Sequence, residues 1–508
     1  MSAVRQAPPP ALTQTAAARP GLRAALRRVP RAAWACAAVA MLNAVVWAML
    51  TPPFHVPDEP QHVAYAQYFA ETGKLPRPVQ GTVFSNEEAA AADAVGMNSV
   101  IGNRGGRPPW TEAQEDGLRA SLARPLSRVS QGGNSNVTNN PPLYYFAEAI
   151  PYKLASSGDF FARLFWMRLL SALLAGVTVL FVFLFLRELL PAAPWAWTVG
   201  ALAVAFQPTF GFISGGVNND SLFFTAAAAT FFLLARAFRR GLTPRLGLAL
   251  GVAVAVGVLG KATMVGLLPG VALGLAALAW RAGPERRGAA LRGAAVAVAA
   301  VAVPVAAYML ANRLAWDRPL WSGAGTASTT GSGHPSSTSG LLSYAWQFYL
   351  PRLPFMSAFK PTGYPVWEVW FKGFIGRFGW LDYGFRQWVY WLALGIWVPM
   401  LALAGAALYR ARAVLRARWP EAATYAGMTV GLLVLIVIAG YRGRIDSQTV
   451  FEQARYLLPL LCLYAGVVAL AARGAGRRLA PAAGGVLVGL AMGHGLFAML
   501  LTVSRFYG

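Results

Sequence analysis

The chain has 508 residues, of which 56% are hydrophobic and 13% are charged, and its formal net charge at pH 7 is +24. This balance excludes an ordinary water-soluble domain, in which roughly a quarter of the residues are charged. Only two cysteines occur, Cys36 and Cys462, both inside apolar segments, which excludes a disulfide framework and a Cys-based zinc site.

Long apolar runs recur along the whole chain. An α-helix needs about 20 residues to cross the hydrocarbon core of a bilayer, and runs such as 169–186 and 429–440 reach or approach that length. They lack the two-residue alternation of a membrane β-barrel. We therefore predict an all-α polytopic membrane protein with about eleven spans, at residues 33–52, 164–186, 195–212, 220–236, 245–260, 262–280, 293–311, 388–408, 422–440, 455–472 and 482–503.

The basic residues gather on one side of this topology. Short cytoplasmic loops collect Lys and Arg, whereas translocated loops do not. Six Arg precede the first span, and the loops after spans 2, 4, 6, 8 and 10 hold sixteen more of the 44 basic residues. We therefore expect a cytoplasmic basic tail at residues 1–32, a first span retained as an anchor, and an external carboxyl terminus. Because this topology explains the positive charge, we predict no nucleic-acid partner.

Two long connections, residues 53–163 and 312–387, lie on the opposite side, which we expect to be external. The first holds an acidic motif and a Gly/Asn-rich stretch. The second begins with a low-complexity stretch and ends with WEVWFKGFIGRFGWLDYGF, whose aromatic rings suit the headgroup layer. We expect both to cover the outer face of one transmembrane domain, residues 33–503.

An acidic pair, Asp58 and Glu59, follows the first span directly. Polar groups close to a membrane are costly, so they call for an explanation. The stretch EPQHVAYAQYFAETG predicts a helix that begins at this pair, and His62 would lie on the same face. Helix capping is the alternative explanation; it accounts for Glu59 as well as a functional role does, and for Asp58 less well.

Another acid, Asp220, stands at the outer start of the fourth span in SGGVNNDSLFF. Asn-Asp-Ser before an apolar run is also a capping signature, so capping and substrate contact are both open for Asp220. The sequence contains no closely spaced histidines, which disfavours zinc. Asp58, Glu59 or Asp220 are suitable ligands for a hard cation such as Mg²⁺ or Mn²⁺.

Three further residues of the outer face are candidates for binding a phosphate. Lys261 lies in GVLGKATMVGLLPG and divides a long apolar stretch. Arg455 and Tyr456 are the first residues of the tenth predicted span. An ammonium and a planar guanidinium both suit a phosphate. The alternatives are snorkelling to lipid headgroups for Lys261 and a salt bridge to Asp446 or Glu452 for Arg455.

Acids and cations at one face of a bundle describe a site for a lipid-linked phosphate. A carboxylate there can accept a proton from an incoming hydroxyl. Lys or Arg, with or without a metal ion, can stabilise the departing phosphate. The chemistry of these residue types therefore favours group transfer between a membrane-embedded donor and an external acceptor.

The ordered motifs PDEPQHVAYAQYFAETGKLP, NNPPLYYFAEAIPYKL, NNDSLFFTAAA, GKATMVGLLP, IGRFGWLD and ARYLLPLLCLYAG carry a resemblance. Over about residues 33–475 the chain resembles a largely uncharacterised family of bacterial multi-pass membrane proteins in the GT-C glycosyltransferase superfamily. The resemblance implies a GT-C-like bundle in the cytoplasmic membrane. It also implies sugar transfer, usually with inversion, from a polyprenyl-phosphate-linked donor to a cell-envelope glycan, lipid or protein.

The resemblance also implies roles for particular residues. Asp58 and Glu59 match the acidic pair of the first external loop, and Asp58 would be the general base. Asp220 matches the second acidic motif, as a sugar or metal contact, while Lys261 and Arg455 would neutralise the donor phosphate. The chain departs from the family pattern in two ways. The second acidic motif reads NND and not Asp-x-Asp, and we identify no separate carboxy-terminal periplasmic domain in the sequence. Acceptor recognition would therefore fall to the two external loops.

Two other functions are compatible with this sequence. A transporter or flippase of lipid-linked sugars would have ionisable residues near the middle of the bilayer and repeated broken helices. The charges here cluster at one face, and the sequence shows no convincing internal repeat. A non-catalytic protein that binds or assembles lipid-linked glycans is the third hypothesis, because a shared scaffold does not establish an activity.

Overall fold

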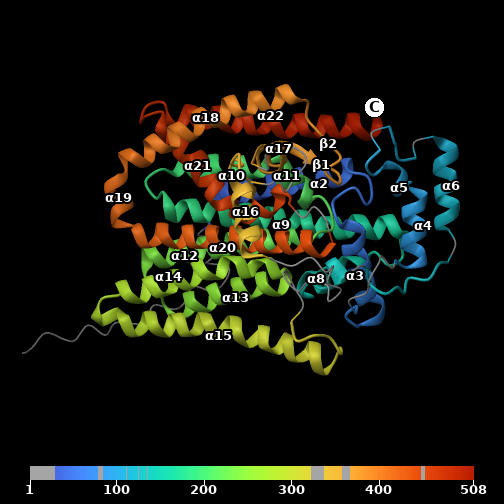
Figure 1. Cartoon of the computed structure of the whole chain (residues 1–508), viewed down its shortest axis with the longest axis horizontal. Coiled ribbons are helices and arrows are strands. Elements are labelled where there is room, and N and C mark those ends of the chain that lie inside the picture. Colours follow the sequence, from blue (N-terminus) through green and yellow to red (C-terminus); the bar gives the residue numbers. More distant parts are fainter. Residues whose placement is uncertain are drawn as a thin grey trace, which may run out of the picture.

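The computed structural model describes residues 29–77, 84–103, 105–109, 111–123, 125–133, 135–321, 337–356, 366–447 and 452–508. These residues form a helical bundle with a group of short helices at one end (Figure 1). The elements of the bundle are α2 (Arg31–Leu50), α9 (Phe160–Leu189), α10 (Pro194–Ala205), α11 (Pro208–Ser214), α12 (Asp220–Arg240), α13 (Pro244–Gly260), η1 (Ala262–Leu267), α14 (Leu268–Arg281), α15 (Pro284–Leu314), α18 (Gln387–Arg410), α20 (Trp419–Ser447), η3 (Ala454–Leu460), α21 (Leu461–Gly474) and α22 (Ala480–Tyr507).

The bundle matches the predicted membrane spans. Among the described residues, nine helical segments are long and apolar enough to cross a membrane, and the bent pair α10 and α11 would make a tenth. The shorter apolar helix α13 coincides with the remaining predicted span. The prediction of an all-α polytopic membrane protein is therefore confirmed.

Several spans are interrupted at the same end of the bundle. Helices α10 and α11 meet at an angle of 61°, where Gln207 is extended before Pro208, because proline disfavours a helical residue before it. Lys261 is extended between α13 and η1, and η1 and η3 are 3₁₀-helices that lead into α14 and α21. Irregular backbone at membrane depth is tolerated where protein buries it or where it lines a cavity.

The two ends of the bundle differ in composition. At one end lies a cap made of α3 (Glu59–Thr72), α4 (Asn86–Ala94), α5 (Met97–Val100), α6 (Glu112–Leu122), α7 (Ser135–Thr138) and α8 (Leu143–Leu154). We call this the cap end; the carboxyl terminus lies there too (Figure 1). The opposite end, with α19 (Arg412–Ala417), collects the arginine-rich loops that follow α9, α12, α14, α18 and α21. We call it the arginine end.

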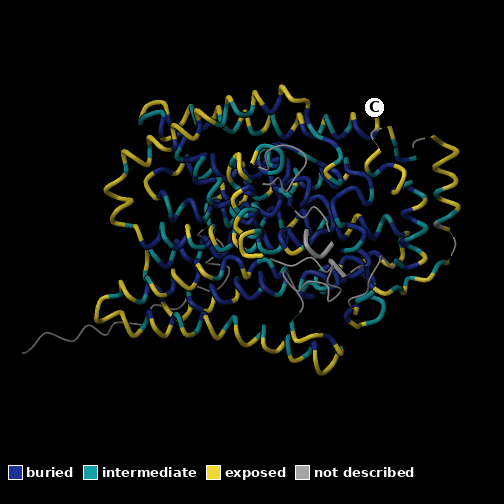
Figure 2. The backbone as a smooth tube through the Cα atoms, in the orientation of Figure 1, coloured by how far each residue is buried: buried dark blue, intermediate teal, exposed yellow. Residues whose placement is uncertain are grey.

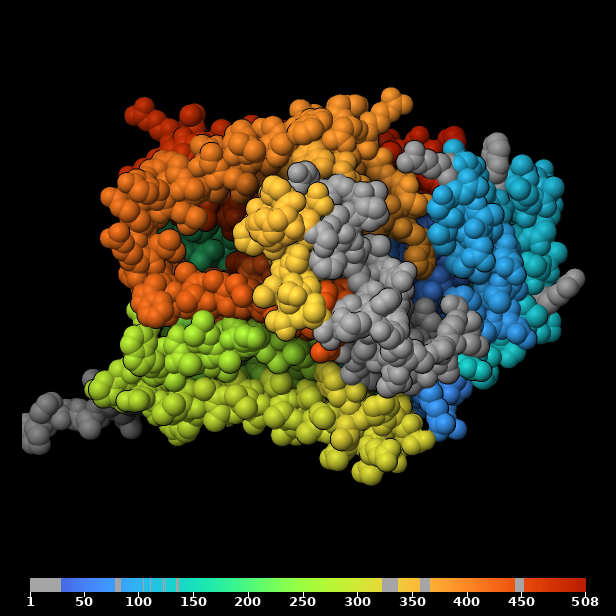
Figure 3. Space-filling model, in the orientation of Figure 1, coloured from blue at the N-terminus to red at the C-terminus, as the bar shows by residue number. Residues whose placement is uncertain are grey.

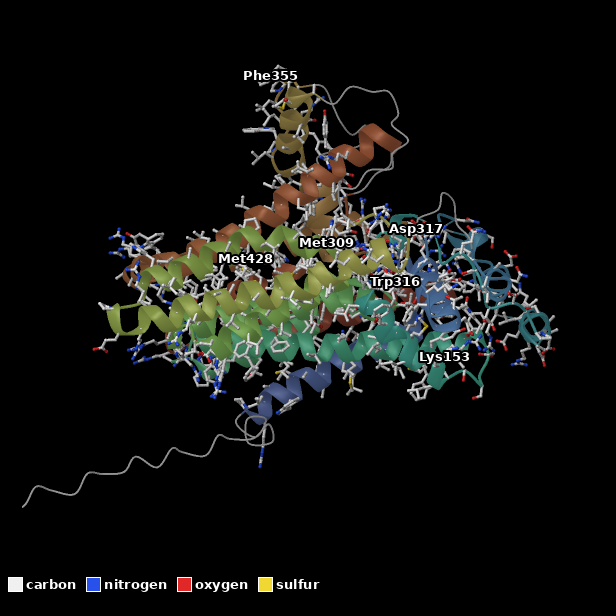
Figure 4. The ribbon with its side chains drawn as sticks, turned by 90° about the horizontal axis from the view of Figure 1, so that it is seen from below. Lys153, Met309, Trp316, Asp317, Phe355 and Met428 are labelled. Atoms are coloured by element: carbon white, nitrogen blue, oxygen red, sulfur yellow. The ribbon has the colours of Figure 1, made fainter. Side chains whose placement is uncertain are left out.

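The second long connection lies against the side of the bundle. It contains α16 (Thr338–Tyr349), the π-helix η2 (Val366–Phe371), α17 (Lys372–Gly376) and an antiparallel pair, β1 (Arg377–Phe378) and β2 (Tyr383–Gly384). Helix α16 crosses the face between α18 and α20 (Figure 3). The segment after it, with the exposed side chain of Phe355, projects away from the bundle (Figure 4).

Burial separates the inner helices from the outer ones. Residues along α12 are mostly buried, whereas α15, α18 and α22 expose many side chains (Figure 2). The exposed side chains on these outer helices include Val303, Leu310, Leu392 and Leu500. Apolar surface of this kind suits contact with lipid. The chain is therefore a multi-pass membrane protein, and α12, which begins with Asp220, is the most buried of the nine apolar helical segments found among the described residues.

Candidate functional site

Asp58 lies in the turn between α2 and α3, at the cap end. Its backbone is left-handed, with φ of 63°, a conformation that is uncommon for residues other than glycine. Its side chain makes no capping hydrogen bond to α3 and instead forms an ion pair with Arg455. Because 38% of the Asp58 side chain is exposed, this carboxylate can be approached from outside the protein.

Four charged side chains form a connected group, which we call the ionic cluster: Asp58, Arg455, Asp220 and Lys261. Arg455 Nε is 3.8 Å from Asp220 Oδ2, and Lys261 Nζ donates to Asp220 Oδ1 at 2.6 Å. Asp220 and Arg455 are almost fully buried, with side chains 2% and 5% exposed. Two acids alternate with two bases, so the cluster is neutral as a whole.

The helix interruptions place these residues together. Asp220 begins α12, Lys261 is the extended residue after α13, and Arg455 belongs to η3. Before Asp220, the Gly-Gly turn lies so close to α2 and its exit that a Cβ on Gly216 would come within 2.5 Å of Val56. The sequence SGGVNND is therefore suited to a turn packed tightly against the Asp58 segment.

The alternatives left open by the sequence can now be compared with the contacts. The Asp220 carboxylate bonds Lys261, while the side chain of Asn218 accepts the hydrogen bond from the Asp220 N–H. Because Lys261 forms this ion pair, its ammonium group does not snorkel to lipid headgroups. The side chain of Asp446 lies outside the described residues, and Glu452 accepts a hydrogen bond from Tyr344 at 2.7 Å.

His62 and two tyrosines line the cluster on the cap side. His62 Nδ1 and the Tyr145 hydroxyl are 2.9 Å apart, and the Tyr145 ring stacks on Tyr65 with centroids 3.7 Å apart. Burial lowers the pKa of His62 to about 3, with Lys261 and Arg455 adding to the effect and Asp58 opposing it. His62 is therefore a neutral imidazole at physiological pH, which donates a hydrogen bond from one ring nitrogen and accepts one at the other.

The Asp58 carboxyl is ionised at neutral pH. Desolvation by the surrounding protein would raise its pKa, but the positive charges of Arg455 and Lys261 outweigh this and hold the pKa below its usual value of 3.8. The lowering depends chiefly on Arg455. Any ligand that draws this guanidinium away would therefore make Asp58 a stronger base.

Glu59 has different surroundings from Asp58. It is fully buried, and Arg168 donates to both of its oxygens, at 2.8 and 2.6 Å. The backbone N–H groups of Phe54 and Val217 donate to the same carboxylate. Arg168 was not anticipated as a site residue, although an arginine inside an apolar span is a recognisable signal. These contacts favour a structural role for Glu59, which joins the exit of α2 to the turn before α12.

A small pocket adjoins Arg455, and we call it the polar pocket because charged side chains form part of its otherwise apolar lining. It has a volume of about 90 Å³ and lies between the Pro57 segment, α11, η2, α17 and η3. Glu368 and Arg377 also line it, and Glu368 forms ion pairs with Lys372 at 2.7 Å and Arg377 at 2.6 Å. Sequence reasoning interpreted this segment only as interfacial aromatic residues and missed these charges. Tyr456, next in the chain, is buried with its ring 5.4 Å from the Arg455 guanidinium.

An apolar groove of about 400 Å³ lies on the other side of α17. It runs between α10, α18, α21 and α22, and its lining includes Trp397, Gly489 and Gly493. Helix α17 separates the two spaces, because Gly373 lines the polar pocket and Ile375 lines the apolar groove. A polar pocket and an apolar groove therefore meet at one short helix.

A divalent cation at Asp58 and Asp220 stays a prediction. Among the described residues, no group of three or more His, Cys, Asp or Glu side chains could hold a metal ion. The Arg455 guanidinium lies between the two carboxylates, paired with Asp58 and near Asp220. Mg²⁺ or Mn²⁺ would have to displace Arg455 to bridge these acids, so this arrangement does not fit a resident metal.

Comparisons with known proteins identify a family for this chain. No curated protein and no solved structure matches it. A family model described as "Predicted membrane protein (DUF2142)" matches residues 41–464. This region begins within α2 and ends within α21, so it includes the cap and the whole ionic cluster. The chain therefore belongs to the DUF2142 family of predicted membrane proteins.

Proposed function

We propose that this protein is a glycosyltransferase of GT-C type that uses a polyprenyl-phosphate-linked sugar donor and acts on a cell-envelope acceptor. The observation that carries the proposal is the ion pair between Asp58 and Arg455. It joins a partly exposed carboxylate to a buried cation at the edge of a pocket. A general base and a phosphate-binding group are what a transfer from a phosphate-linked donor requires.

In the proposed reaction, Arg455 changes its partner from the Asp58 carboxylate to the donor phosphate. The donor phosphate would draw the guanidinium away from Asp58, and the pKa of Asp58 would rise because its main neighbouring charge is lost. Asp58 then accepts the proton of the acceptor hydroxyl, whose oxygen forms a bond to the anomeric carbon. The bond from that carbon to the phosphate oxygen breaks, and polyprenyl phosphate leaves with its charge near Arg455 and Lys261.

The remaining site residues would bind the substrates. His62 and Tyr145 present neutral hydrogen-bonding groups beside Asp58, and Tyr456 packs near Arg455. The apolar groove beyond α17 offers the donor's hydrocarbon chain a place within the membrane. Asp220 would hold Lys261 in position through their ion pair.

A transporter of lipid-linked sugars is the second candidate. The interrupted helices α10 to α11, α13 to η1, and η3 to α21 favour it, since transporters bind substrates at discontinuous helices. The ionic cluster lies at the cap end and Asp58 is partly exposed, which favours sugar transfer over transport. A non-catalytic protein that binds lipid-linked glycans is the third candidate.

The test is transfer of radiolabelled sugar in membranes from a panel of polyprenyl-phosphate donors. We expect Asp58→Asn to lower the transfer rate by about 100-fold or more, the usual contribution of a general base. Asp317→Asn is the control, because Asp317 lies on the surface with a side chain 74% exposed. Transfer that persists in Asp58→Asn would refute the role of Asp58. Movement of intact donor across the bilayer without product would favour the transporter.

A further inference from the structure

The arginine end holds a large cavity that the proposed sugar transfer does not use. Its volume is about 800 Å³, and it lies between the carboxyl ends of α9, α12 and α14 and the beginnings of α15 and α20. We call it the arginine cavity, because five of its lining residues are Arg239, Arg240, Arg281, Arg286 and Arg418. A volume of this size is typical of ligand-binding pockets.

The cavity has an excess of positive charge. Its two acidic lining residues, Glu188 and Glu421, are both already in ion pairs. Glu188, with a side chain 2% exposed, is paired with Arg239 at 3.1 Å and Arg240 at 2.8 Å. Glu421 is paired with Arg418 at 2.7 Å. Five guanidinium groups thus face two neutralised carboxylates, which leaves three uncompensated positive charges.

These arginines are partly held in place. The buried Glu188 holds two guanidinium groups side by side, and Arg281 Nη1 donates to the Ala417 carbonyl at 3.1 Å. The side chains of Arg239 and Arg240 remain 41% and 49% exposed. Each guanidinium has five N–H donors, more than these contacts use. Donors in planar forks match the oxygens of phosphate and carboxylate groups, to which they can donate two parallel hydrogen bonds.

A tryptophan pair beside the cavity indicates its depth in the membrane. Trp280 and Trp419 are 70% and 55% exposed, and their ring centroids are 6.3 Å apart. Exposed tryptophans of membrane proteins prefer the headgroup layer. Arg281, which follows Trp280 in the chain, therefore places the arginine cavity at the level of lipid headgroups.

We propose that the arginine cavity binds a phosphate-bearing anion, and that its occupant is the headgroup of an anionic phospholipid. The geometry favours the lipid over a soluble phosphate compound, because the tryptophan pair lies beside it. This site is independent of the proposed sugar transfer, which would take place at the opposite end of the bundle.

The test uses the purified full chain in detergent. Binding of phosphatidylglycerol, phosphatidylcholine and inorganic pyrophosphate is measured by native mass spectrometry and by the shift in melting temperature. The cavity variant is Arg281→Gln with Arg286→Gln, because among the described residues neither arginine forms an ion pair with a carboxylate. The control is Arg477→Gln with Arg478→Gln, two exposed arginines at the same end outside the cavity lining.

We expect phosphatidylglycerol to bind the native chain and the control, and the cavity variant to lose about tenfold or more in affinity. Arg281→Lys with Arg286→Lys keeps the positive charge but removes the planar guanidinium. We expect its loss of affinity to be smaller than that of the cavity variant and larger than that of the control. Equal losses in the cavity variant and the control would overturn the proposal, because general attraction to basic residues predicts that result. Equal binding of phosphatidylcholine would also overturn it. Pyrophosphate that displaces the lipid and stabilises the chain equally would identify a soluble phosphate as the occupant.

Discussion

At the scale of single residues, Arg455 connects the two acids of the candidate site. It is paired with Asp58 and lies 3.8 Å from Asp220, whose other oxygen bonds Lys261. Because most of these groups are buried, the loss of one partner leaves a charge without compensation. The cluster is therefore held together by neutrality as much as by any one contact.

A double-mutant cycle tests this view. We expect Lys261→Met to lower the free energy of unfolding by about 3 kcal/mol, because it leaves a buried acid in excess. Adding Asp220→Asn restores neutrality, so the double variant should be more stable than Lys261→Met alone. The measurement is denaturant unfolding in mixed micelles.

The matched control for this cycle is the exposed pair of Glu115 and Arg119 in α6, 51% and 71% exposed. Removing the Arg119 charge should change the free energy of unfolding by less than about 1 kcal/mol. A double variant at Asp220 and Lys261 that is less stable than either single variant would contradict the argument from neutrality.

At the scale of elements, the interrupted helices and α17 organise the space around the cluster. The helices are interrupted at Gln207, at Lys261 and at η3, and all three interruptions lie at the same end of the bundle. Helix α17 lies between the polar pocket and the apolar groove. A lipid-linked donor has the same division, with a charged phosphate at one end of a hydrocarbon chain.

Filling the apolar groove tests whether it holds that chain. A Cβ at Gly489 or Gly493 would meet no atom within 4 Å, so Gly489→Leu and Gly493→Leu should fold. We expect them to raise the apparent KM for a long-chain donor about tenfold, because the added side chains occupy apolar contact surface worth about 1.5 kcal/mol or more. Short-chain donors should be affected much less.

The control for the groove is Gly485→Leu, one helical turn earlier on α22. A side chain at Gly485 also meets open space, but this residue does not line the groove. If Gly485→Leu changed the KM as much as Gly489→Leu does, the effect would belong to the surface of α22 in general. Kinetics with donors of two chain lengths measure the difference.

At the scale of the whole molecule, the two ends have separate chemistry. The cap end carries the ionic cluster and a partly exposed acid, whereas the arginine end carries a positively charged cavity. The basic loops predict that the arginine end faces the cytoplasm and the cap end faces outward. Sugar transfer to a cell-envelope acceptor requires this orientation.

Cysteine labelling tests the orientation in intact cells. With the two native cysteines replaced, Asp317→Cys and Arg416→Cys introduce single thiols on opposite ends of the bundle; Asp317 lies near the cap (Figure 4). We expect a membrane-impermeant thiol reagent to label the Asp317→Cys protein directly. It should label the Arg416→Cys protein only after the membrane is opened. The reverse pattern would place the cap in the cytoplasm and refute the proposed function.

Several features of the site depend on packing that no single segment reveals. The sequence placed Asp58, Asp220, Lys261 and Arg455 at one face, and the structure brings all four together. The observed ion pairs join Lys261 to Asp220 and Arg455 to Asp58, and the sequence alternatives named neither pair. The role of Arg168 beneath Glu59 also went unpredicted, since it depends on α9 packing beside the exit of α2.

The amino-acid sequence by itself determined the all-α membrane fold, the positions of the spans and the division of the chain between two ends. These properties arise from hydrophobicity summed over about 20 residues and from the charge of short loops, which are local quantities. Only the tertiary structure decided which charges pair, where the pocket, groove and cavity lie, and that Glu59 and Asp58 have different surroundings. These features depend on which helices pack side by side. Packing brings together residues that are distant in the sequence, and it depends on the complementary shapes of the helices, which local composition does not encode.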